Sequence, residues 1–167
     1  MEKEDLLTYC GRYGGSCARY RGYTAFRAAA ALLAEICDAH GFRYWMPKEV
    51  KEFNYDEFRK GLEFFSKEDT WLVCPACCKG GGGGPPDCVR DCCQRHGVDV
   101  CFECPEFPCD RVKGDKDMLK RAGEYRRLGR EGWLRRAAEK AERGFEFHTG
   151  KCYRVCVEDG KLKSSCD

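Results

Sequence analysis

Residues 74–109 read CPACCKGGGGGPPDCVRDCCQRHGVDVCFECPEFPC, a stretch that holds nine of the fifteen cysteines of this 167-residue chain. Five consecutive glycines and a Pro-Pro pair interrupt it, so we expect a loop here, not a regular helix or strand. Ordering such a loop costs about 1 kcal/mol or more per residue. A structural zinc ion contributes roughly 10–16 kcal/mol on binding, which makes a metal the natural source of compensation.

The spacing of these cysteines also indicates a metal site. Cys74 and Cys77 form one C-x-x-C pair, and Cys101 and Cys104 form a second. One tight turn of this kind aims two thiolates at a single ion, and two such pairs complete a tetrahedral site. Zinc is the expected metal. A [4Fe-4S] cluster is the alternative, because it also takes four cysteines and a Cys-Pro step is common near it.

Disulfide bonding is the competing interpretation. An odd number of cysteines cannot pair completely within one chain. The first residues, MEKEDLLTYC, lack the apolar core of a signal peptide, and no run of about eighteen apolar residues predicts a membrane span. We therefore expect a cytoplasmic protein, and a reducing compartment favours metal-bound thiolates over disulfides. Cys37 lies on the apolar side of a predicted helix and is interpreted as a small buried hydrophobe.

The rest of the chain predicts a small α+β domain over residues 1–167, with helices around a metal-clipped loop. Residues 10–110 form the cysteine-rich metal-binding core with two helices. Residues 111–143 form a basic helical segment, and residues 144–167 form a short β-hairpin or meander. Thr149-Gly150 and Asp159-Gly160 supply the turns of that β element.

Helical periodicity supports these assignments. Thr24 is a plausible N-cap for a helix in which Phe26, Ala29, Leu33 and Ile36 recur at helical spacing, and Gly41 suits its end. A second helix begins after Asn54. Its apolar stripe, assigned to the core, consists of Tyr55, Phe58, Leu62 and Phe65. In the basic segment, Gly129 and Gly132 predict a break or kink.

Charge is unevenly distributed although the formal net charge is only +2. Residues 1–110 carry 14 basic and 18 acidic side chains, whereas residues 111–143 carry 12 basic and 6 acidic ones. A solvated helix face is the ordinary explanation. Contact with an acidic protein or a nucleic acid is the sharper one, carried by Arg126, Arg127, Arg130, Arg135 and Arg136. The sequence CARYRGY at residues 17–23 interleaves arginine with aromatic residues, but the modest net charge supports a nucleic-acid partner only weakly.

The motif YCGRYGGSCARY at residues 9–20, followed by CPAC at 74–77 and CFECPEFPC at 101–109, resembles the prokaryotic cysteine-rich domain of unknown function 3795 family. The resemblance extends to residues 54–65 and 129–144. Gly14 stands where the family has a further cysteine, and the family's biochemical role is not established. The resemblance implies metal ligands at Cys10, Cys17, Cys74, Cys77, Cys88, Cys92, Cys101, Cys104 and Cys109. Whether Cys77 or Cys78, and Cys92 or Cys93, are the ligands is left open.

The sequence thus predicts a zinc-binding, cysteine-rich module that mediates structural or protein–protein contacts. An iron–sulfur electron-transfer or redox accessory subunit of a larger enzyme is the alternative. We expect no catalytic activity of the chain on its own. Water activation at an open metal position, with Glu103 or Glu106 as the base, is a weaker third interpretation. We expect a protein partner and no membrane, and the oligomeric state is left open.

Overall fold

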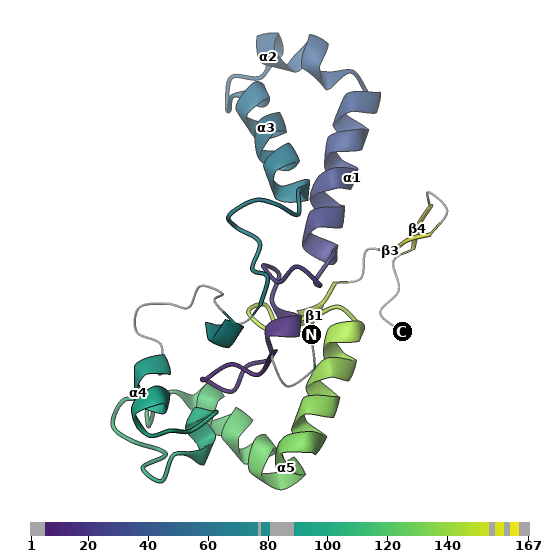
Figure 1. Cartoon of the computed structure of the whole chain (residues 1–167). Helices are drawn as coiled ribbons and strands as arrows, with labels where there is room; N and C mark the ends of the chain where they lie inside the picture. The colour runs from purple at the N-terminus through teal and green to yellow at the C-terminus, as the bar shows by residue number, and fades with distance from the viewer. Residues whose placement is uncertain (1–5, 77, 81–88, 154–155, 159–160, 164–167) are drawn as a thin grey trace.

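The structure, a computed structural model, describes residues 6–76, 78–80, 89–153, 156–158 and 161–163, the last two ranges by their backbone alone. It confirms the α+β class, since helices dominate and short antiparallel strands follow them. Figure 1 shows a helical hairpin extending from a lobe that contains the other helices. No helix within the described ranges is long and apolar enough to cross a membrane.

The hairpin consists of α1 (Ala25–Ala39) and α3 (Tyr55–Ser66). At its tip lie the 3-10 helix η3 (Phe42–Tyr44) and the short helix α2 (Met46–Glu49). A small core of its own, formed by Ala34, Cys37, Leu62 and the partly buried Phe42, holds the two long helices together.

The predicted helix boundaries in the hairpin are confirmed. Thr24 occupies the N-cap position of α1, although its side chain makes no capping hydrogen bond, and Gly41 adopts a φ of 64° just beyond the end of the helix. The side chain of Asn54 caps α3 by accepting a hydrogen bond of 3.0 Å from the backbone N of Glu57. The thiol of Cys37 is buried, as expected.

The assignment of the α3 stripe to the core is half wrong. Tyr55 and Leu62 are buried, but Phe58 and Phe65 are 37% and 40% exposed. The apolar side chains whose spacing predicted α1 are also exposed, because α1 and α3 each cover only one side of the other helix. We call this surface the open apolar face; it consists of Phe26, Leu33, Ile36, Phe58 and Phe65, all 37% to 43% exposed. The rings of Phe26 and Phe65 join its two halves, with centroids 5.5 Å apart.

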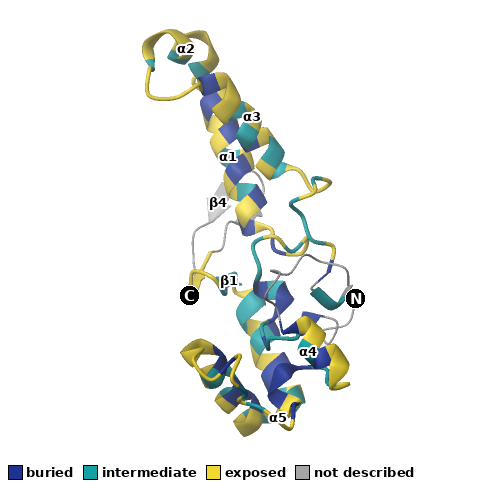
Figure 2. Ribbon diagram, turned by 90° about the vertical axis from the view of Figure 1, so that its left-hand side faces the viewer, coloured by how far each residue is buried: buried dark blue, intermediate teal, exposed yellow. Residues whose placement is uncertain are grey.

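The lobe contains the main hydrophobic core. Its elements are η2 (Gly14–Ser16), η4 (Cys78–Gly80), α4 (Arg90–Arg95), η5 (Cys101–Glu103) and α5 (Lys116–Glu142). Figure 2 shows buried positions concentrated where α5 faces the other elements of the lobe. The N-terminal loop supplies Leu6, Leu7 and Tyr13 to this core, and α5 supplies Met118, Ala122, Tyr125, Trp133, Leu134 and Ala138.

The cysteine-rich stretch takes part in this core, so apolar packing as well as any bound metal can compensate for its ordering. Val89, Cys93, Val100, Cys101 and Phe102 are all buried in it. The stretch also includes the helix α4, contrary to the expectation that it contains no regular structure. Its apolar residues pack into a core that other segments of the chain mainly form. The glycine run falls outside the described residues, which resume at residue 89.

The predicted break in the basic segment is confirmed. Within α5, Gly129 has a φ of 69° and a ψ of 168°, a conformation that is nearly restricted to glycine. The two arms of α5 therefore meet at an angle (Figure 1). Residues before the kink, such as Met118 and Tyr125, and after it, such as Trp133 and Leu134, belong to the same core.

The C-terminal β element forms two separate hairpins instead of a meander. Strand β1 (Phe145–Glu146) pairs with β2 (Lys151–Cys152), and β3 (Cys156–Glu158) pairs with β4 (Lys161–Lys163), both antiparallel. The first hairpin is tied to the N-terminal loop by two hydrogen bonds. Phe147 N donates to Ser16 O at 3.0 Å, and Tyr23 Oη donates to Gly144 O at 2.8 Å.

Candidate metal centre

The N-terminal loop, residues 6–23, positions both C-x-x-C segments through backbone contacts. Tyr20 and Cys74 form a parallel β-bridge. The backbone N of Cys101 donates a hydrogen bond of 2.8 Å to Tyr9 O. Segments that are far apart in the sequence are thus held on one short loop, which itself carries two of the predicted ligands.

Four thiols lie around that of Cys101. Its electrostatic neighbours include Cys109, Cys92 and Cys104, and its thiol also interacts with that of Cys93. Cys92 and Cys93 lie in helix α4, Cys101 lies in η5, and Cys104 is the C-cap of η5. We call this set the Cys101 group; it consists of Cys92, Cys93, Cys101, Cys104 and Cys109, of which all but Cys93 are predicted ligands.

Burial and crowding keep the thiols of Cys93 and Cys101 neutral at ordinary pH. Burial, and next the thiols of Cys101, Cys92 and Cys104, raise the pKa of Cys93 to about 12. Burial and the neighbouring Cys109 and Cys92 raise the pKa of Cys101 to about 11. Desolvation and repulsion by neighbouring thiolates both raise the free energy of the charged form, so only a nearby cation makes that form favourable.

The other predicted ligands lie elsewhere in the lobe. Cys17 and Cys74 are electrostatic neighbours, and burial followed by the effect of Cys74 raises the pKa of the Cys17 thiol, against hydrogen bonds that lower it. The thiol of Cys10 lies 3.3 Å from Thr8 Oγ1. Cys77 and Cys88 fall outside the described residues.

No closed metal site is present among the residues that the structure describes. Within them, no set of three or more cysteine, histidine, aspartate and glutamate side chains is arranged to hold an ion. The Cys101 group has the donor chemistry of a zinc site but not its ligand arrangement. Metal binding therefore stays a prediction.

The sequence left open whether Cys92 or Cys93 is a ligand. The side chain of Cys93 is 1% exposed, and its Sγ lies 3.7 Å from Tyr9 O. It is thus a core residue that also touches the thiol group. Its spacing of four residues from Val89, another buried side chain, is the signal that predicts this burial.

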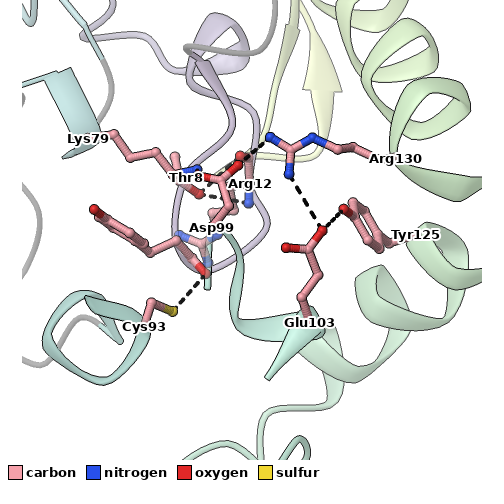
Figure 3. Close-up of polar contacts among 9 residues, drawn as sticks. Thr8, Arg12, Lys79, Cys93, Asp99, Glu103, Tyr125 and Arg130 are labelled. Atoms are coloured by element: carbon pink, nitrogen blue, oxygen red, sulfur yellow. Dashed lines mark hydrogen bonds and ion pairs between the residues drawn. The ribbon is translucent and has the colours of Figure 1, made fainter. Parts of the chain in front are cut away.

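An ion-pair network fastens the cysteine-rich stretch to the kink of α5 (Figure 3). The carboxylate of Asp99 pairs with Lys79 Nζ at 2.5 Å and with the guanidinium of Arg130. Glu103 accepts a hydrogen bond of 2.5 Å from Tyr125 Oη and lies 3.5 Å from Arg130 Nη1. Burial raises the pKa of Asp99, but hydrogen bonds from Lys79 and Arg130 outweigh it, and the net pKa is lowered.

Several side chains named as candidates for partner contacts have internal partners. Arg130 belongs to the network above, and Arg136 Nη1 pairs with Glu124 Oε1 at 2.8 Å. The guanidinium of Arg126 lies over the Phe107 ring at 5.4 Å. Within the 17–23 motif, Tyr23 is buried. Only part of the predicted basic surface is therefore available to a partner.

The comparisons with known proteins identify a family. A family model described as "Protein of unknown function (DUF3795)" matches residues 6–114. The match confirms the resemblance based on the cysteine motifs, while residues 129–144 lie beyond its end. No curated protein and no solved structure matches the chain.

Proposed function

The chain belongs to the DUF3795 family, and from that premise we propose that it is a zinc-binding module whose metal stabilises a surface for protein–protein contact. The ion would be held by Cys92, Cys101, Cys104 and Cys109. Bound by these four thiolates, zinc would hold their segments together without redox chemistry.

The convergence of three other predicted ligands on Cys101 carries the proposal. These cysteines come from α4, from η5 and from the residues after it, yet their thiols are electrostatic neighbours. Cys101 and Cys104 are buried, and Cys92 and Cys109 are half-buried. Thiolates this close would repel one another, but together they can bind a divalent cation. The proposal includes a reorientation of these side chains around the ion, since they are not arranged for one in the structure.

Metal analysis of anaerobically purified protein tests the assignment. We expect about one or more equivalents of zinc in colourless protein. Cys101→Ser should lose one equivalent, because thiolate ligands dominate the affinity of such sites. Cys37→Ser is the matched control, since Cys37 is an equally buried cysteine in the separate hairpin core.

Two outcomes count against zinc. Brown protein with iron and acid-labile sulfide would favour the iron–sulfur alternative. Protein without either metal, folded equally well before and after chelation, would eliminate the metal-binding proposal.

The open apolar face supports the second part of the proposal. Helix α1, AFRAAAALLAEICDA, has only three charged residues among fifteen. A helix that is apolar around most of its circumference is ordinarily covered on several sides. Here α3 covers one side only, and its own exposed residues, Phe58 and Phe65, continue the apolar surface.

We assign this face to a second copy of the chain, with two hairpins forming a four-helix bundle. Its five large side chains expose about 400 Å² in total, given 150–250 Å² for a whole aromatic side chain. Phe53, whose ring centroid lies 5.6 Å from that of Phe58, extends it toward the tip, where Tyr44 and Trp45 are also exposed. The apolar area of the face and the tip together approaches the roughly 800 Å² per partner that stable interfaces bury.

Light scattering after gel filtration tests this contact. Leu33→Glu should convert a dimer to a monomer because it places a charge in the apolar interface. Ala31→Glu is the matched control, since Ala31 is exposed on the same helix and lies beside Glu35 and Asp38 on the polar side of the hairpin. A wild-type protein that is monomeric at high micromolar concentration would refute the assignment to a second copy.

A further inference from the structure

A cavity lies between the two arms of α5, and the Cys101 group does not line it. Its volume is about 540 Å³, within the usual range for small-molecule sites. Both arms of α5 line it, and the N-terminal loop and the β1–β2 hairpin complete its wall. None of the described residues that line it is a cysteine.

Positive charge dominates this cavity. Its lining includes five cationic side chains, namely Arg12, Lys120, Arg121, Arg136 and Lys140, and two carboxylates, Asp117 and Glu124. Glu124 is already paired with Arg136. Among the described residues, the lining thus has an excess of three positive charges, which favours an anionic ligand.

Two of the guanidiniums lack a carboxylate partner. Among the described residues, no acidic group lies within 4.0 Å of Arg12 or Arg121, and Arg121 Nε is buried without a hydrogen-bond partner. Burial, and next the charge of Arg12, lower the pKa of Arg121. An anion placed between the two groups would relieve both the repulsion and the unsatisfied donor.

Aromatic side chains form the rest of the wall. Trp133 is buried in the core at the edge of the cavity. The guanidinium of Arg12 lies 5.0 Å from the centre of the Phe147 ring, and Lys140 Nζ lies 5.7 Å from that of Phe145. The cavity therefore offers planar apolar surface next to its cations, which suits a ligand with a flat ring as well as a negative charge.

We propose that this cavity binds a small organic phosphate with a planar ring, of the mononucleotide class. Arg12 and Arg121 contact the phosphate, because guanidinium groups match its oxygens in a bidentate manner. The ring lies against the aromatic wall. This site is independent of the proposed metal-binding function.

Isothermal titration calorimetry with AMP, adenosine and inorganic phosphate tests the proposal. AMP should bind, and adenosine and inorganic phosphate should each bind at least about tenfold more weakly, since each lacks half of the recognised chemistry. Arg12→Gln should weaken AMP binding at least about tenfold. Glu124→Gln should strengthen it, because it removes a carboxylate and frees Arg136 to contact the ligand.

Arg127→Gln is the matched control, because Arg127 is exposed on α5 and does not line the cavity. It should leave AMP binding unchanged. Three results would overturn the proposal: no binding of AMP, equal binding of adenosine and AMP, or equal losses in Arg12→Gln and Arg127→Gln. A short single-stranded oligonucleotide that binds far more tightly than AMP would show that the cavity is part of a nucleic-acid surface instead.

Discussion

Replacing Gly129 with alanine tests the feature that shapes the lobe, the kink of α5. The φ of 69° and ψ of 168° at this residue cost an alanine about 1–3 kcal/mol. A Cβ added there meets no atom within 4 Å, so the expected loss comes from backbone strain alone. Gly129→Ala should therefore lower the free energy of unfolding by about 1–3 kcal/mol.

Gly123→Ala, in the same helix, provides a control of opposite sign. Gly123 is exposed in regular helix, and an added Cβ there also meets nothing within 4 Å. Alanine at such a position stabilises a protein by about 0.4–1 kcal/mol, because it restricts the unfolded chain. The two variants make the same chemical change, so only the backbone conformation distinguishes them.

Urea unfolding followed by circular dichroism measures both effects, with the metal content held constant. We expect the two midpoints to move in opposite directions, with unfolding free energies that differ by about 1.4–4 kcal/mol. If Gly129→Ala is as stable as Gly123→Ala, α5 is straight in solution. The cavity and the contacts of Arg130 would then not exist as described.

Three further outcomes follow from the structure. Asp99→Asn should lower the free energy of unfolding, measured with urea, by about 1 kcal/mol or less, since Asp99 is partly exposed. Because the pKa of Asp99 is lowered in the folded state, this contribution exists above the usual pKa of Asp and disappears as the pH falls through the folded value. Asn54→Ala should lower the thermal midpoint by the loss of about 1 kcal/mol of capping, whereas Asn54→Asp retains the cap and should not. Metal-free, reduced protein should lose stability as the pH rises from about 9 to about 11–12. The reason is that Cys101 and Cys93 keep their protons in the folded state, whereas the same thiols ionise in the unfolded chain. A free energy of unfolding that is constant over this range would contradict the burial of these thiols.

Some features of this protein were readable from short stretches of sequence. Asn54 followed by an amphipathic run predicted the start of α3, and Gly129 predicted the kink in α5. The cysteine motifs identified the family. Each of these depends on residues within one or two turns of chain, where backbone preference and hydrogen bonding are local.

Burial was not readable in the same way. Phe58 and Phe65 have the spacing of core residues, yet they are exposed because the hairpin offers each helix only one partner. Val100 and Phe102 lie in a stretch that looked unsupported, yet they are buried under α5. The face of a helix that is covered depends on which distant segment packs against it.

The composition and spacing of the sequence alone determined that this chain is a cysteine-rich α+β protein with candidate metal ligands. Only the tertiary structure decided that four of those ligands gather in the Cys101 group while Cys17 and Cys74 lie together elsewhere, and that cations from the N-terminal loop and both arms of α5 line one cavity. The reason is that local interactions act along the chain, whereas a site is formed by side chains that long-range packing brings together.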